Sequence, residues 1–265
     1  MTTDDLLSKL RTAIKGPHAS IHRLNLARIA LCLPPRVDGV GLYALGLSRY
    51  AELFYEVEAA WASLIGDPGD ITYQQAEIIG QEQGGLDPKT RVQTLLRRLY
   101  MPELQRTRAL KTDLQFLRAL DVTRNPDIWE SINDWNAGRQ VRQEIHRRIL
   151  DKPHILVAYI WIMYSSMLYG GRVIRAQLLK AGPDFWGLSA AELSPHRRTP
   201  CPLSFWQIDD DVGVKVKFRV RVAEVEQFLS SREQQDIFEE ARAIFGMFEM
   251  LTRSLDEEAK RINAA

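Results

Sequence analysis

Apolar residues recur every three or four positions over most of this chain, which is the period of amphipathic helices. Leu6, Leu7, Leu10 and Ile14 form the first such stripe. Gly16-Pro17 follows it and is expected to end the first helix, because proline lacks the N–H that a helix interior uses. The full pattern predicts helices over 4–15, 18–33, 43–65, 89–100, 102–120, 126–135, 139–150, 155–168 and 230–262. Ser230 and Glu233 fit a capping box, which predicts the start of the last of these helices.

Three segments lack this helical pattern. Residues 67–88 are rich in Gly, Gln and Asp and predict a loop with at most one short helix, whereas 183–211 predicts an irregular, proline-rich excursion of the kind that often carries function. In 212–222, valine or phenylalanine alternates with Gly, Lys and Arg, which taken alone indicates a strand. A lone strand would leave its backbone groups unpaired, so we expect a helix there as well.

These elements predict an all-α, single-domain helical bundle over residues 1–265, because no linker separates two cores. The hydrophobic content of 45% is enough for a sizeable core and excludes disorder as the main state. The net charge of +1 offers no surplus for a polyanion, so nucleic-acid binding is not expected. No apolar run approaches the roughly 20 residues of a membrane span. Charges within residues 1–15 argue against a secretory signal, and two cysteines suit a reducing, cytoplasmic setting.

Common catalytic signatures are absent: the sequence contains no CxxC, HExxH, GxSxG, P-loop or Rossmann glycine motif. No histidine has a glutamate three residues before it, which disfavours a di-iron carboxylate centre. Asp209, Asp210 and Asp211 could bind a hard cation through their oxygens, but adjacent carboxylates more often form a solvent-exposed turn.

His18 and His22 lie four positions apart and would share one helix face. Imidazole is a good axial ligand for haem iron, so the pair is a candidate haem site. The alternative is two partly exposed histidines on an ordinary helix.

The most hydrophobic predicted helix is interrupted by Gly170 and Gly171. Each glycine lowers the stability of a helix by about 1 kcal/mol relative to alanine. They indicate either a kink that brings bare backbone against a flat ligand or close helix–helix packing. Further along, Lys217 and Arg221 lie four apart, so on a helix they could clamp carboxylates such as haem propionates. The alternative for these two cations is a solvated basic face.

These three sites, in this order, resemble those of the haem oxygenase superfamily, and the resemblance covers most of the chain. The segment from Leu10 to His18 looks like the family's proximal helix, which implies that His18 is the axial iron ligand and Arg11 a propionate contact. His22 falls where family members carry a polar partner. The run that ends in Leu31-Cys32-Leu33-Pro34-Pro35 is similar to a fungal branch of haem-oxygenase-like proteins.

Leu156-Val157-Ala158-Tyr159, Tyr164 and Gly170-Gly171 resemble the family's distal helix, and the resemblance places Ser166, Gly170 and Gly171 beside the reacting centre. Lys217 and Arg221 match its propionate-binding pair. The sequence departs from the family at Met167, which replaces an aspartate that organises distal water, and at Ser166, which replaces a glycine. A thioether cannot order water as a carboxylate does, so we expect impaired proton delivery.

The resemblance implies a haem-binding protein that, with oxygen and electrons from a reductase, opens haem to biliverdin, iron and carbon monoxide. Two alternatives remain at this point. One is an enzyme of the same fold that acts on another apolar small molecule in a cavity lined by Phe54, Trp161, Met163 and Met167. The other is a non-enzymatic haem carrier or sensor.

Overall fold

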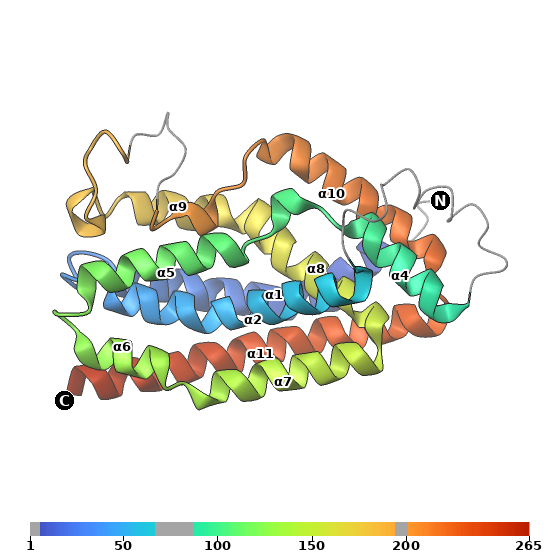
Figure 1. The fold of residues 1–265 in the computed structure, drawn as a ribbon, viewed down its shortest axis with the longest axis horizontal. Helices are drawn as coiled ribbons and strands as arrows, with labels where there is room; N and C mark the ends of the chain where they lie inside the picture. Colours follow the sequence, from blue (N-terminus) through green and yellow to red (C-terminus); the bar gives the residue numbers. More distant parts are fainter. Residues whose placement is uncertain (1–5, 67–86, 194–200, 265) are drawn as a thin grey trace.

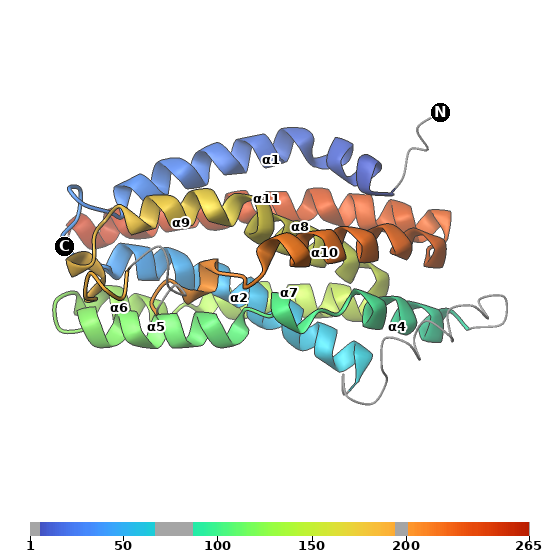
Figure 2. The same cartoon turned by 90° about the horizontal axis from the view of Figure 1, so that it is seen from above.

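The computed structural model describes residues 6–66, 87–193 and 201–264, and every regular element in these ranges is a helix. Two of the longest helices, α1 (Leu6–Leu31) and α11 (Ser231–Ala264), lie side by side and run in the same direction, while α2 (Gly41–Ile65) runs opposite to them (Figures 1 and 2). The predicted all-α fold is confirmed. The predicted loop over 67–88 falls almost entirely outside the described residues.

Shorter helices surround these three, and most lie close to the predicted ranges, but no helix was predicted over 171–179. They are α4 (Pro88–Leu99), α5 (Thr107–Asp121), α6 (Pro126–Asn133), α7 (Asn136–Asp151), α8 (Leu156–Ser165), α9 (Gly171–Leu179) and α10 (Asp211–Val225). In the middle of the bundle, α8 is buried on every side from Leu156 to Tyr164, which explains its uninterrupted apolar run. None of the described helices is long and apolar enough to cross a bilayer.

The predicted break at Gly16-Pro17 is wrong, because α1 continues through Pro17. Proline removes one backbone hydrogen bond, but Leu10 and Ile14 before it and Ile21 after it are buried and hold both halves of the helix against the core. Figure 2 shows α1 as a bowed helix, in keeping with a proline in its interior.

The predicted helix over 102–120 is also wrong in its first turn, since a short 3₁₀ helix (Pro102–Leu104) precedes α5. The buried Glu58 carboxylate of α2 accepts hydrogen bonds from the backbone N–H groups of Arg106, at 2.6 Å, and Thr107, at 2.9 Å. A carboxylate at this position satisfies donors that the first turn leaves open, so it fixes where α5 begins.

Residues 211–225 form the helix α10, as expected, in spite of their alternating pattern. Val214, Phe218 and Val222 are buried, whereas Val212, Val216 and Val220 are exposed on the opposite face. The alternation therefore reflects a helix with apolar residues on two faces.

The three adjacent aspartates mark the start of α10. Asp210 has a φ of 46° and accepts a hydrogen bond from the backbone N–H of Gly213, while Asp211 pairs with Arg172 and Lys215. Within the described residues no three His, Cys, Asp or Glu side chains are grouped as a metal site would require. Asp210 thus caps α10 and Asp211 forms ion pairs, while Asp209 and Asp210 are exposed to solvent.

The last helix begins with the predicted capping box. The backbone N–H of Ser230 donates to the Glu233 carboxylate at 2.8 Å, and the Glu233 N–H donates to the Ser230 hydroxyl at 3.3 Å. At the start of α11, the side chain of each residue thus accepts a hydrogen bond from the backbone N–H of the other, which has no partner within the helix.

Candidate functional site

A cavity of about 820 Å³ lies between α1, α2, α11 and the junction of α8 with α9. Its lining is largely apolar and includes the four predicted residues Phe54, Trp161, Met163 and Met167. The volume falls within the range of small-molecule and cofactor sites. Most charged or imidazole side chains on its wall come from α1.

Four of these side chains project from one face of α1: Arg11, Lys15, His18 and His22. The two imidazole rings are parallel to within 6°, with centroids 6.0 Å apart. The rings of His18 and Phe245 pack edge-to-face, also with centroids 6.0 Å apart. Both histidines are exposed to solvent at the edge of the cavity wall. Partial burial, followed by the charge of neighbouring His22, lowers the pKa of His18. The neutral imidazole, which is the form that ligates a metal, is thereby favoured.

The wall at the junction of α8 and α9 contains Gly170, the first residue of the glycine pair. Between α8 and α9 the chain forms a single π-helical turn, Ser166–Gly170, at which the helix changes direction (Figure 1). Such turns are frequent at functional sites. A Cβ atom on Gly170 would meet nothing within 4 Å, and one on Gly171 would meet only the Trp206 ring at 3.7 Å and the Met167 methyl at 4.0 Å. Helix packing therefore requires glycine at neither position, and Gly170 leaves open space on the cavity wall.

The same π-helical turn carries no carboxyl group. Met167, which the sequence resemblance aligns with an aspartate, is buried and lies on the cavity wall. The Ser166 hydroxyl also lies on this wall and donates to the Ile162 carbonyl at 2.8 Å. Neither side chain is arranged to deliver a proton into the cavity.

Lys217 and Arg221 do not line the cavity, contrary to the placement we expected. The Lys217 ammonium is 2.9 Å from the Glu103 carboxylate, and the Arg221 guanidinium donates to the Tyr100 carbonyl. Between them in sequence, Arg219 lies on the cavity wall instead. Residues two apart on a helix point about 160° away from each other. When α10 turns Arg219 toward the cavity, Lys217 and Arg221 therefore point away from it.

Two further features of the lining were missed. Gly46 of α2 also lies on the wall, where an added Cβ atom would have no neighbour within 4 Å. A glycine inside a long helix lowers the stability of that helix, and this was the signal that could have identified Gly46 from the sequence. A polar group lies nearer the C-terminal end of α1, where the Tyr50 hydroxyl is 3.2 Å from Asn25 Oδ1 and 2.9 Å from the Thr252 hydroxyl.

Cys32 lies at this same end of the cavity, and its thiol donates to the Ile29 carbonyl at 3.2 Å. Burial raises the pKa of the Cys32 thiol to about 12. This cysteine is therefore a protonated, unreactive part of the lining.

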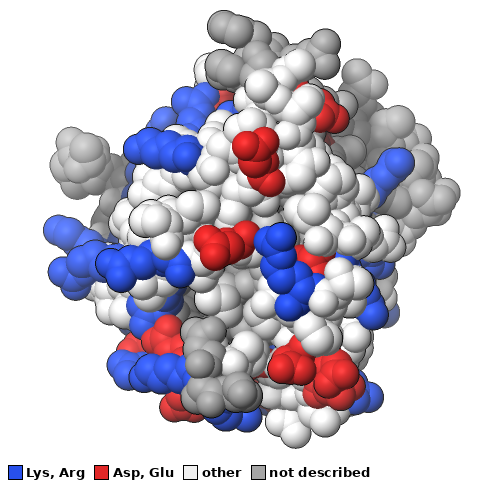
Figure 3. All heavy atoms as spheres, turned by 90° about the vertical axis from the view of Figure 1, so that its left-hand side faces the viewer, with Lys and Arg blue, Asp and Glu red and all other residues white. Residues whose placement is uncertain are grey.

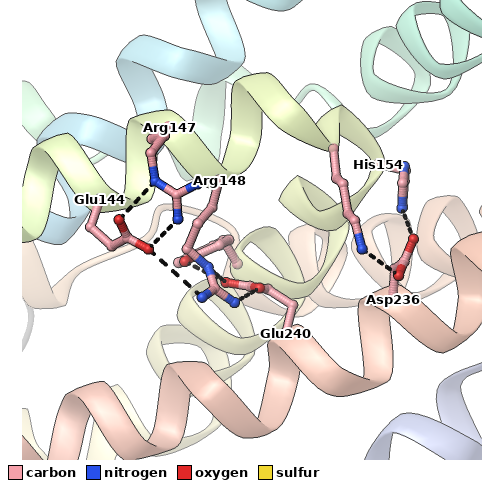
Figure 4. Close-up of polar contacts among 8 residues, drawn as sticks. Glu144, Arg147, Arg148, His154, Asp236 and Glu240 are labelled. Carbon is pink, nitrogen blue, oxygen red and sulfur yellow. Dashed lines mark hydrogen bonds and ion pairs between the residues drawn. The ribbon is translucent and has the colours of Figure 1, made fainter.

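Two other histidines are bound to carboxylates outside the cavity. His146 Nδ1 is 2.7 Å from Glu56, and His154 Nε2 is 2.9 Å from Asp236. Figure 4 shows His154 and Asp236 beside a second ion-pair group, in which Arg148 of α7 reaches Glu240 of α11. His146 of α7 thus pairs with α2, whereas Arg148 of α7 and His154, just after α7, pair with α11.

The surface has no dominant charge at the end of the molecule where the C-terminus lies. Lysine and arginine side chains are interspersed with aspartate, glutamate and neutral surface there (Figure 3). This mixture agrees with the net charge of +1 and offers no basic patch for a polyanion on that face.

Comparison with known families identifies the chain's relatives. The family model described as "Heme oxygenase" matches residues 86–254, more than half of the chain. This chain belongs to the haem oxygenase family. The match includes the π-helical turn and α10, whereas α1, with both cavity histidines, lies outside the matched range.

Solved haem oxygenases share the fold over nearly the whole chain. Heme oxygenase-1 from the cyanobacterium Synechocystis, in complex with heme, superposes with a TM-score of 0.68 at 18% identity and covers 98% of this chain and 96% of that one. The heme oxygenase of Leptospira interrogans gives 0.61 at 19% identity, covering 94% and 98%. Because the sequence identities are below 20%, these structural similarities establish a shared fold alone.

A fungal relative is similar to part of the chain. "Heme-binding protein HMX1" of Saccharomyces cerevisiae is 24% identical over 162 residues, which is 57% of this chain and 45% of that protein. The chain thus spans less than half the length of this curated relative.

Proposed function

We propose that this haem oxygenase family member binds haem in the α1 cavity, where an imidazole of α1 would hold the iron; the sequence resemblance points to His18 as that residue. One observation carries the proposal. The imidazoles of α1 lie on one wall of the cavity, and Gly170 leaves open space on the wall formed by the junction of α8 and α9. The apolar lining suits the faces of a porphyrin. The relatives named above as heme-binding, or solved with heme, support the same ligand.

The residues present fit the carboxylates of haem as well as its ring. Arg11 and Lys15 of α1 and Arg219 of α10 lie on the cavity wall, where they would pair with propionates. Lys217 and Arg221, the pair expected from the resemblance, would first have to release Glu103 and the Tyr100 carbonyl. Arg11 and Arg219 are therefore the stronger candidates.

We further propose that the chain holds haem and opens it slowly. Bound haem supplies a redox-active iron, and in the family reaction the porphyrin is itself opened to biliverdin, iron and carbon monoxide with electrons from a reductase. The protein must hold and move protons on the distal side for that reaction. Met167 has no proton to give, and the Ser166 hydroxyl donates to the Ile162 carbonyl.

Titration of the purified chain with hemin tests the binding proposal. We expect a saturable one-to-one complex whose Soret band shows imidazole ligation, and loss of that ligation in the His18→Ala/His22→Ala double variant. His146→Ala is the matched control, because this histidine lies outside the cavity against Glu56 and should leave the spectrum unchanged. If the chain forms no saturable hemin complex, the cavity serves another apolar small molecule.

Replacement of Met167 by aspartate tests the slow-opening proposal. With a reductase and oxygen, we expect the wild-type protein to form biliverdin slowly and Met167→Asp to do so about tenfold faster, because the carboxylate can relay protons. Biliverdin absorbance measures the rate, and hemin affinity establishes that the variant still binds. Met167→Leu preserves the volume without a carboxyl group and should match the wild-type rate. A wild-type rate equal to that of Met167→Asp would contradict the proposal.

A further inference from the structure

We propose that the cavity offers haem two binding positions, one helical turn apart along α1, with His18 as the ligand in the first and His22 in the second. This inference rests on the proposed haem binding and deepens it. It concerns which of this chain's own residues hold the ligand.

A repeated pair of residues on α1 is the first line of support. Arg11 precedes His18 by seven positions, and Lys15 precedes His22 by the same seven positions. All four side chains lie on the cavity wall. The second cation–imidazole pair therefore repeats the first after four residues, a rise of about 6 Å along a helix.

The geometry of the two imidazoles is equivalent. Their rings are parallel to within 6° at a centroid separation of 6.0 Å, so both present the same orientation at successive turns. Neither ring is hydrogen-bonded to another part of the chain that the structure describes, whereas His146 and His154 are each tied to a carboxylate. Both cavity histidines are thus available as ligands.

The cavity is long enough for a ligand to occupy either position. Its α1 wall extends from Leu7 to Leu31, about 36 Å at 1.5 Å per residue, which is well beyond the diameter of a porphyrin. Open space also occurs at two places on the facing walls, beside Gly170 and beside Gly46. The hydrogen-bonded group of Asn25, Tyr50 and Thr252 lies past His22 and would limit any further displacement.

Single histidine variants test this proposal directly. Hemin titration followed by resonance Raman or EPR spectroscopy should find imidazole-ligated haem in both His18→Ala and His22→Ala, each with affinity reduced by less than about tenfold. Only the double variant should lose the imidazole signature. If His18→Ala loses it as completely as the double variant does, there is one position, and His22 is at most a partner of His18. That result would leave haem binding itself intact, whereas failure of the wild type to bind hemin would overturn both proposals.

The upstream cations provide a second, independent readout. In the His22→Ala background, where His18 is the ligand, Arg11→Ala should weaken hemin binding about fivefold and Lys15→Ala should have little effect. In the His18→Ala background the order should reverse. Equal effects of each cation in both backgrounds would show that the two pairs do not act as separate sets, and the proposal would be wrong.

Discussion

Replacement of Gly170 by phenylalanine is expected to weaken hemin binding about 100-fold, equivalent to about 3 kcal/mol, while the protein remains folded. The new side chain would enter the open space at the cavity wall, where a Cβ atom meets nothing within 4 Å. Isothermal titration or Soret titration measures the loss, and circular dichroism establishes that the helices persist.

Two glycine variants control this experiment. Gly246 of α11 also has nothing within 4 Å of a Cβ position but does not line the cavity, so Gly246→Phe should bind hemin as the wild type does. Gly170→Ala adds only a methyl group and should retain binding, with a gain in stability of about 0.5–1 kcal/mol from helix propensity. Undiminished hemin affinity in Gly170→Phe would show that the ligand does not use this wall.

Replacement of Glu58 by alanine is expected to destabilise the fold by about 3–5 kcal/mol. The Glu58 carboxylate is buried and accepts from the Tyr164 hydroxyl at 2.9 Å as well as from two backbone N–H groups at the start of α5. Its removal would leave all three donors buried without this acceptor. The free energy of unfolding, obtained from urea denaturation, measures the effect.

Two control variants distinguish the loss of the hydrogen bonds to Glu58 from the loss of a negative charge. Glu58→Gln keeps one carbonyl acceptor and should cost less than the alanine variant. Glu103→Ala removes an exposed carboxylate that pairs with Lys217, and its effect should stay within about 1 kcal/mol. If Glu58→Ala were no more harmful than Glu103→Ala, Glu58 would not be what fixes the start of α5.

Much of the fold could be predicted because it follows local rules. Three- and four-residue spacing located the helices, and Ser230 with Glu233 located the start of α11. The break predicted at Pro17 failed because packing on both sides outweighs one missing hydrogen bond. The start of α5 could not be predicted, since Glu58, which fixes it, lies 48 positions before Arg106 in the sequence.

The candidate site could be predicted in part for the same reason. Local features were enough to single out three of its residues. His18 and His22 are spaced by one helical turn, and Gly170 destabilises the helix that it was predicted to interrupt. The sequence could not show which cation of α10 lies on the cavity wall, because the alternating pattern does not reveal which face of that helix meets the cavity. Only the packing of α10 decides that Arg219, and neither Lys217 nor Arg221, lies on the wall.

The protonated state of Cys32 bears on the class of haem protein that this cavity can form. Burial raises the pKa of this thiol to about 12, which disfavours the thiolate, the form in which cysteine binds iron. The imidazoles of α1 are therefore favoured over this sulfur as ligands to a metal, although both lie on the same cavity wall. The chain can thus hold a redox-active ligand while its cavity cysteine stays in the less reactive thiol form.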